Sequence, residues 1–137
     1  MLILDTNVVS ELMKPPAVRD PGVMTWFRSL SDQPYMTAVT LGELFSGAYR
    51  LDPGKRQHEL LTLIEEAAAE MAGVMHFDSR AAEAFGRISA ARRRTGRPTQ
   101  PLDAQIAAIA LVNESTLATR NVSDFDDLAV ELINPWG

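Results

Sequence analysis

Short apolar segments alternate with amphipathic helical segments from one end of this chain to the other. The first apolar segment, residues 1–4, is followed by Asp5, Thr6 and Asn7, residue types that begin helices. The segments expected to be strands are residues 1–4, 35–39, 74–77, 116–119 and 130–133. Strands that alternate with helices are joined by right-handed crossovers, which predicts a three-layer α/β domain. Its centre is a mainly parallel five-stranded sheet with helices on both faces.

The helices between these strands are bounded by capping residues, prolines and glycines. The first three are expected over 8–13, where the prolines at 15 and 16 stop the helix, from Asp20-Pro21 onwards, and over 40–51. A longer helix is expected to end near Gly73. The last two are a helix capped by Asp78 that ends at Gly96, and a helix with Pro101 at its first position.

Length and composition indicate a single domain over residues 1–137. No apolar stretch approaches the roughly 20 residues that span a bilayer, and the first residues do not have the pattern of a signal peptide. We therefore expect a cytoplasmic protein without membrane contact. The chain has no cysteine, which excludes disulfides, thiolate metal sites and a cysteine nucleophile.

The formal net charge of −5 argues against a protein that holds nucleic acid by bulk charge, since such domains are usually basic. This net charge is compatible with an enzyme that contacts phosphates through one local basic patch.

Four acidic residues are expected at the carboxyl edge of the sheet, where open parallel sheets bind their ligands. Asp5 follows the first strand, and Glu43 lies in the first turn of the helix after the second strand. Asp103 lies in the first turn of the helix that starts at Pro101, and Asp124 in the loop that leaves the fourth strand.

Each acid also has a simpler explanation. Asp5 can be an N-cap, and Thr40 with Glu43 forms the T-x-x-E pattern of a capping box. Asp103 can favour a helix dipole, and Asp124 can be a turn residue. Four carboxylates at one edge, however, raise one another's pKa, and a cation at their centre removes that cost. Oxygen ligands without cysteine or nearby histidine favour Mg²⁺ or Mn²⁺ over zinc, and such an ion suits phosphodiester hydrolysis.

Four motifs, in this order, resemble the VapC/FitB group of PIN-domain toxins and together cover nearly the whole chain. They are L-I-L-D-T-N-V-V-S-E-L (residues 2–12), T-L-G-E-L (40–44), P-L-D-A-Q-I-A-A-I-A (101–110) and L-A-T-R-N-V-S-D-F (117–125). The resemblance implies a PIN-like fold and a Mg²⁺-dependent endoribonuclease that is toxic to its own cell. It also implies a small DNA-binding antitoxin as partner and a homodimer.

The resemblance also implies which residues form the site. The metal-site acids of the family fall on Asp5, Glu43 and Asp103. The fourth position falls on Asn121 or Asp124; we assign Asp124, with Asn121 and Thr119 as supporting polar groups. Asp5 and Asp103 are expected to ligate Mg²⁺, with Mn²⁺ as a substitute, and Glu43 and Asp124 to act directly or through water.

The arginines that precede Asp103 form the only dense basic patch, which consists of Arg92, Arg93, Arg94 and Arg97. Cations at a helix C-terminus complement the helix dipole. They can equally steer RNA phosphates towards the acids, so we predict substrate contacts for Arg92, Arg93 and Arg97. We predict substrate contacts also for Arg120 and for the polar residues on either side of it, Thr119 and Asn121.

Two other functional classes remain open. A non-catalytic PIN-fold interaction module could keep the acids for structural reasons. An aspartyl-phosphate enzyme also opens with a strand and an aspartate. Phosphatases of that kind have a second aspartate two residues after the first, where this chain has Asn7. Receiver domains have an acidic pair near the first strand, and the residues Ile3, Leu4 and Asp5 contain no such pair.

Overall fold

The computed structural model describes residues 1–137 and contains five strands, all paired in parallel. They are β1 (Leu2–Leu4), β2 (Met36–Thr37), β3 (Val74–Met75), β4 (Thr116–Ala118) and β5 (Leu132–Ile133). β4 lies between β1 and β5, and β2 pairs with β3. A bridge between Ile3 and Tyr35 joins the two sets, because Leu4 N donates to Tyr35 O and Tyr35 N to Leu2 O, both at 2.8 Å. The order is therefore β3-β2-β1-β4-β5, which confirms the predicted fold class.

Six α-helices connect these strands. They are α1 (Thr6–Met13), α2 (Pro21–Arg28), α3 (Ala38–Tyr49), α4 (Lys55–Glu70), α5 (Ser79–Arg94) and α6 (Pro101–Val112), and two short 3-10 helices, η1 (Pro16–Val18) and η2 (Val122–Asp124), lie in loops. None of them is both long and apolar enough to cross a bilayer.

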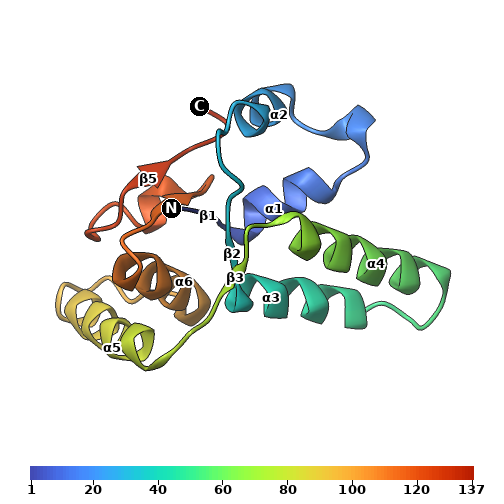
Figure 1. Ribbon diagram of the computed structural model, residues 1–137. Coiled ribbons are helices and arrows are strands. Elements are labelled where there is room, and N and C mark those ends of the chain that lie inside the picture. The colour runs from blue at the N-terminus through green and yellow to red at the C-terminus, as the bar shows by residue number, and fades with distance from the viewer.

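The helices cover both faces of the sheet (Figure 1). The alternation of side chains along the central strand identifies the helices on each face. Ile3 points into an apolar cluster with α5 and α6, while Leu4 points into a second cluster with α1 and the end of α4. Both side chains are fully buried. In β4, Leu117 belongs to the first cluster and Ala118 to the second, so the sheet forms the middle of three layers.

Helix α6 is the most enclosed helix of the domain. Ala104 and all residues from 106 to 110 are buried, and small alanine side chains let α5 pack closely against it. Its first turn, which carries Asp103, is more open than the middle of the helix.

The predicted boundary between the second strand and the next helix was wrong. Residues 38 and 39 are helical and not strand, and α3 starts two residues before the expected Thr40. Thr37 is extended and its hydroxyl accepts the N–H of Thr40 at 3.1 Å, so Thr37 is the N-cap. The fifth strand is also shorter than predicted, with only Leu132–Ile133 paired.

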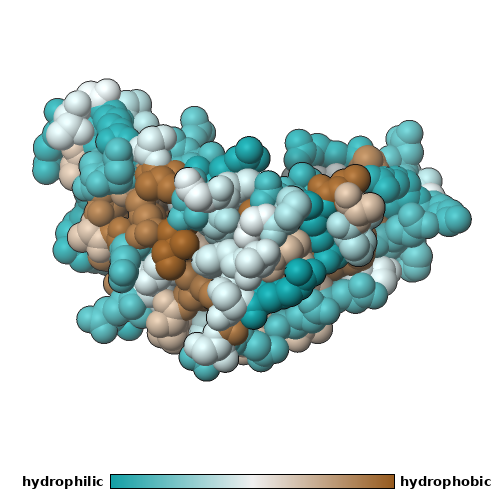
Figure 2. Space-filling view, turned by 90° about the horizontal axis from the view of Figure 1, so that it is seen from above, coloured by the Kyte–Doolittle hydropathy of each residue, from teal (hydrophilic) through white to brown (hydrophobic).

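The outer surface is mostly polar. On the face seen in Figure 2, apolar side chains gather in a larger patch on the left and a smaller one on the right, with polar side chains between them. The most exposed large apolar side chains of the molecule are Met1, Val18, Tyr49, Leu63, Leu102 and Ile133.

Candidate functional site

The carboxyl ends of β1 and β4 lie side by side, and this places Asp5 next to Thr119. Asp5 N donates to Ala118 O at 2.9 Å, and the Thr119 hydroxyl donates to Asp5 Oδ2 at 2.7 Å. Two segments more than a hundred residues apart in the sequence are thus joined at the first predicted site residue. Thr119 is fully buried, so its hydroxyl has a fixed role in this contact.

Asp5 is both a helix cap and a buried carboxylate. Its Oδ1 accepts the N–H of Thr6 at 2.8 Å, which confirms the N-cap role, and Asn7 Nδ2 lies 3.3 Å from Oδ2. The residue is only 4% exposed. Burial raises the pKa of Asp5, although the hydrogen bonds from Thr119, Thr6 and Asn7 act in the opposite direction; the charge of Asp124 raises it further.

Glu43 reaches the same region from α3 through a chain of hydroxyl groups. The Thr6 hydroxyl donates to Glu43 Oε1 at 2.7 Å and lies 2.9 Å from the Thr40 hydroxyl. The Thr37 hydroxyl lies 3.4 Å from that of Thr40 and completes the chain. Side chains from α1 and α3 are therefore held together at this edge of the sheet.

The capping box considered for Glu43 is excluded. With Thr37 as N-cap, the third helical position is Thr40, and Glu43 lies in the second turn of α3 and not in the first turn as predicted. Its carboxylate accepts from Thr6 of another helix.

Asp103 lies in the first turn of α6, as predicted. Its pKa is raised from 3.8 to about 6, first by burial and then by the negative charges of Asp5, Asp124 and Glu43. Arg92 acts weakly in the opposite direction. The structure therefore brings the four predicted acids into one electrostatic cluster, with Asp103 as the member most affected.

Asp124 ends the η2 turn and is exposed. Its side chain makes no hydrogen bond within the chain, whereas its carbonyl oxygen accepts from Arg92. Asn121, the other residue considered for the fourth position, is exposed and its N–H donates to the Thr119 hydroxyl at 3.1 Å. Asn121 thus supports Thr119.

Arg92 is only 5% exposed and its guanidinium is paired with Asp127, surroundings that do not suit the substrate contact predicted for it. Arg97 is partly exposed but is paired with Asp126 at 3.0 Å. Arg93 is exposed and forms no ion pair, so it remains available. The Arg120 side chain lies over the ring of Trp136, 5.0 Å from its centroid. Sequence spacing could not reveal that Arg92 is buried, because its acidic partner lies 35 residues further along the chain.

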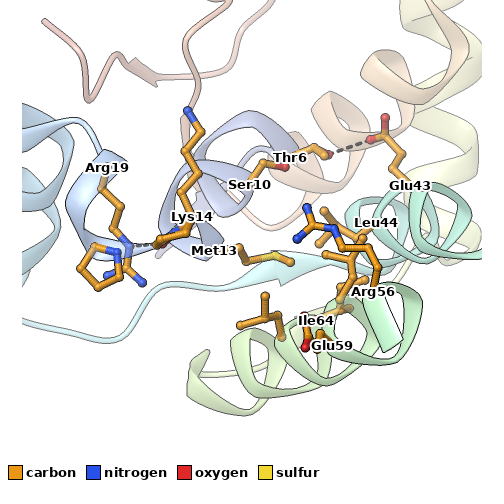
Figure 3. A pocket seen from close by; sticks show the side chains of 15 residues that line it. Thr6, Ser10, Met13, Lys14, Arg19, Glu43, Leu44, Arg56, Glu59 and Ile64 are labelled. Carbon is orange, nitrogen blue, oxygen red and sulfur yellow. Dashed lines mark hydrogen bonds between the residues drawn. The ribbon is translucent and has the colours of Figure 1, made fainter. Parts of the chain in front are cut away.

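A groove of about 680 Å³ leads away from the acids between α1, η1, α3 and α4 (Figure 3). Thr6 and Glu43 lie at one end, joined by their hydrogen bond. Leu44, Leu60 and Ile64 supply apolar lining, and the cations Lys14, Arg19 and Arg56 line the groove as well. The sequence alone does not reveal this groove, because its walls come from separate helices.

The chemistry of the acid cluster suits a hard divalent cation. All four acids offer carboxylate oxygens, the ligands that Mg²⁺ prefers, and after burial the charges of the other three raise the pKa of Asp103. In their present rotamers no three acidic side chains converge closely enough to ligate one ion directly. Mg²⁺ commonly takes only one or two carboxylates and keeps several waters, so it does not require three direct carboxylate ligands.

Comparison with known proteins agrees with this fold. Residues 2–131 match the family model described as "PIN domain". The chain is 36% identical to plasmid stability protein StbB of Pseudomonas syringae and 34% identical to VapC ribonuclease Y4jK of Sinorhizobium fredii, covering 99% of this chain in both cases and 99% and 98% of the relatives. A solved structure, FitAB bound to the IR36 DNA fragment, superposes with a TM-score of 0.88 at 31% identity, covering 100% of this chain and 96% of that one.

The chain therefore belongs to the PIN-domain family. Within this family it is a member of the VapC/FitB group of ribonuclease toxins from toxin–antitoxin systems, as the motifs predicted.

Proposed function

We propose that this toxin hydrolyses RNA phosphodiester bonds with Mg²⁺ held at Asp5, Glu43, Asp103 and Asp124. The observation that carries the proposal is the placement of four acids from different elements at one edge of the sheet, where burial and then the charges of the other three raise the pKa of Asp103 to about 6. A cluster that repels itself in this way is suited to a divalent cation.

The position of each acidic side chain indicates its role in holding the ion. Asp5 is fixed by three hydrogen bonds and Asp103 stands at the start of a rigid helix, so these two would hold the ion directly. Glu43 and Asp124 would hold it directly or orient its waters. A bound divalent ion would lower the pKa of a water and stabilise charge on the phosphoryl oxygens. The hydroxyl chain through Thr6 and Thr40 keeps Glu43 directed at this region.

Purified protein should cleave single-stranded RNA with Mg²⁺ or Mn²⁺ and lose this activity in EDTA. Asp5→Asn or Asp103→Asn should abolish cleavage while the protein stays folded, because an amide is nearly isosteric but a poorer Mg²⁺ ligand. Asp52→Asn is the matched control, since Asp52 is exposed in the loop between α3 and α4 and forms no ion pair. Full activity in either site variant would contradict the assignment.

The alternative is a non-catalytic interaction module, and a metal titration separates the two. An intact site gains about 2.7 kcal/mol of unfolding free energy when the free metal concentration is a hundredfold above Kd. A module that kept its acids only for structure would show no Mn²⁺-dependent rise in melting temperature.

We also propose that the groove in Figure 3 receives a segment of a small DNA-binding antitoxin. A solved relative is a FitAB assembly bound to DNA, which supports a partner of this kind. An apolar segment that lies along Leu44 and Leu60 would end beside Glu43 and would block the acid cluster. Leu60→Asp should weaken binding of the antitoxin while RNA cleavage is preserved; unchanged affinity would place the partner elsewhere. The homodimer and the cytoplasmic location stay predictions.

A further inference from the structure

We propose that Arg92 and Arg97 form an arginine clamp that positions Asp124 in the site. This inference rests on the proposed function, because it concerns the fourth carboxylate of that site. Arg92 lies in the last turn of α5 and Arg97 in the loop that follows this helix, and both bind the segment 122–127 that carries Asp124. They are thus positioning residues, and the RNA contacts first predicted for Arg92 do not fit its surroundings.

Arg92 uses nearly all of its guanidinium inside the protein. Its Nη2 donates to the carbonyl oxygen of Asp124 and to Asp127 Oδ1, its Nε donates to Asp127 Oδ2 at 3.2 Å, and its Nη1 donates to Thr99 Oγ1 at 3.2 Å. The paired contact with both oxygens of Asp127 fixes the plane of the guanidinium as well as its position. Arg92 also holds the pKa of Asp127 below its usual value, so the pair is ionised at neutral pH.

Arg97 makes a second set of contacts to the same segment. Its Nη2 donates to the carbonyl oxygen of Ser123 and to Asp126 Oδ1 at 3.0 Å, and its Nη1 lies 3.4 Å from Asp127 Oδ1. The N–H of Arg97 donates to the carbonyl of Arg92 at 2.8 Å, which couples the two arginines. Gly96 between them has φ of +71°, a conformation that lets the chain turn back after the helix.

The segment needs such support because it contains little regular structure. Its only helical part is the three-residue η2 turn, and Phe125 is its one fully enclosed side chain, 1% exposed. Phe125 anchors the segment in the core. The Asp124 carboxylate has no hydrogen bond of its own, so its direction depends on the backbone that Arg92 holds.

The competing explanation is that the clamp only stabilises the fold. A stabilising pair would lower the melting temperature when broken but would leave the metal affinity of the folded protein unchanged. A positioning pair would also weaken metal binding, and groups that orient metal ligands typically change affinity 10–100-fold.

The test uses Arg92→Met and Asp127→Ala, which break the same contact from opposite sides. Methionine keeps most of the buried volume of Arg92 and leaves a carboxylate that is already partly exposed, so folding is preserved. Arg94→Met is the matched control, because Arg94 is exposed on the same helix end and forms no ion pair. Mn²⁺ affinity is measured by calorimetry well below each melting temperature, together with kcat and KM for RNA cleavage.

Both clamp variants should bind Mn²⁺ about tenfold or more weakly and lose kcat more than KM, while the control matches the wild type. In an Asp124→Asn background, Arg92→Met should change Mn²⁺ affinity by no more than about twofold, because its effect passes through Asp124. Wild-type affinity in both clamp variants, or a full loss in the Asp124→Asn background, would overturn the clamp alone. A wild-type protein that bound no Mn²⁺ would overturn the proposed function together with it.

Discussion

Replacing Asp103 by asparagine should stabilise the metal-free protein at neutral pH. The pKa of Asp103 rises from 3.8 to about 6 in the folded protein because of burial and three neighbouring acids. A shift of this size corresponds to about 3 kcal/mol, and solvent screening of a partly exposed group reduces it to about 1–2 kcal/mol. The charge also favours the first turn of α6 by about 0.3–1 kcal/mol, so the net gain should be near 1 kcal/mol.

The gain should depend on pH in a defined direction. Because the folded pKa lies above the unfolded one, the folded protein binds the Asp103 proton more tightly between pH 3.8 and about 6. The wild type therefore loses stability as the pH rises through this window, and the penalty is complete above it. Asparagine has no such penalty, so the stability difference between variant and wild type should be nearly zero below the window and largest above it.

Urea denaturation in EDTA, followed by circular dichroism at about pH 4 and about pH 7.5, measures this difference. Other acids titrate in both proteins, so their contributions cancel in the comparison. Added Mg²⁺ should reverse the order, because the ion stabilises the wild type and binds the variant poorly. Equal stability of the two proteins at about pH 7.5, or a gain that does not change with pH, would refute the electrostatic reasoning.

Three further outcomes are expected. Glu43→Gln should lose RNA cleavage with little change in melting temperature, since Glu43 caps no helix; an RNase assay beside a melting curve tests this, and unchanged cleavage would remove Glu43 from the site. Thr119→Val should lower the free energy of unfolding by about 1–3 kcal/mol and weaken Mn²⁺ binding, because the buried Asp5 loses its hydroxyl donor; calorimetry that gave wild-type Mn²⁺ affinity would contradict this. Arg93→Ala should make the slope of log RNA affinity against log salt concentration shallower by about 0.7, because one phosphate contact is lost. An unchanged slope would exclude Arg93 as a phosphate contact and make Arg120 the next residue to test.

The placement of the acids could be predicted because it follows from local signals. A buried strand followed by Asp5 and a proline-started helix with Asp103 in its first turn both indicate the carboxyl edge of a parallel sheet. The layers were predictable for the same reason, since alternating strands and helices leave few arrangements.

The sequence-based predictions failed where a residue's structure depends on a partner that is distant in the sequence. Thr37 and Thr40 are both good N-caps, and only the extended backbone at Thr37 shows which of them starts α3. Arg92 resembles its exposed neighbours in the sequence, but Asp127 and Thr99 turn it inward. The groove beside Glu43 was not predicted because periodicity describes one helix at a time.

The central position of β1 in the sheet affects when the domain can fold during its synthesis. Its three residues pair with residues 116–118, so β1 leaves the ribosome more than a hundred residues before this neighbour. Pairing over such a distance is slow, and it cannot begin before the residues between the two strands have been synthesised. Asp5 therefore meets Thr119 and Asp124 only after β4 has been made. A nascent or prematurely terminated chain that lacks β4 would have no assembled acid cluster, and a cell would be exposed to its nuclease activity only after the whole domain has closed.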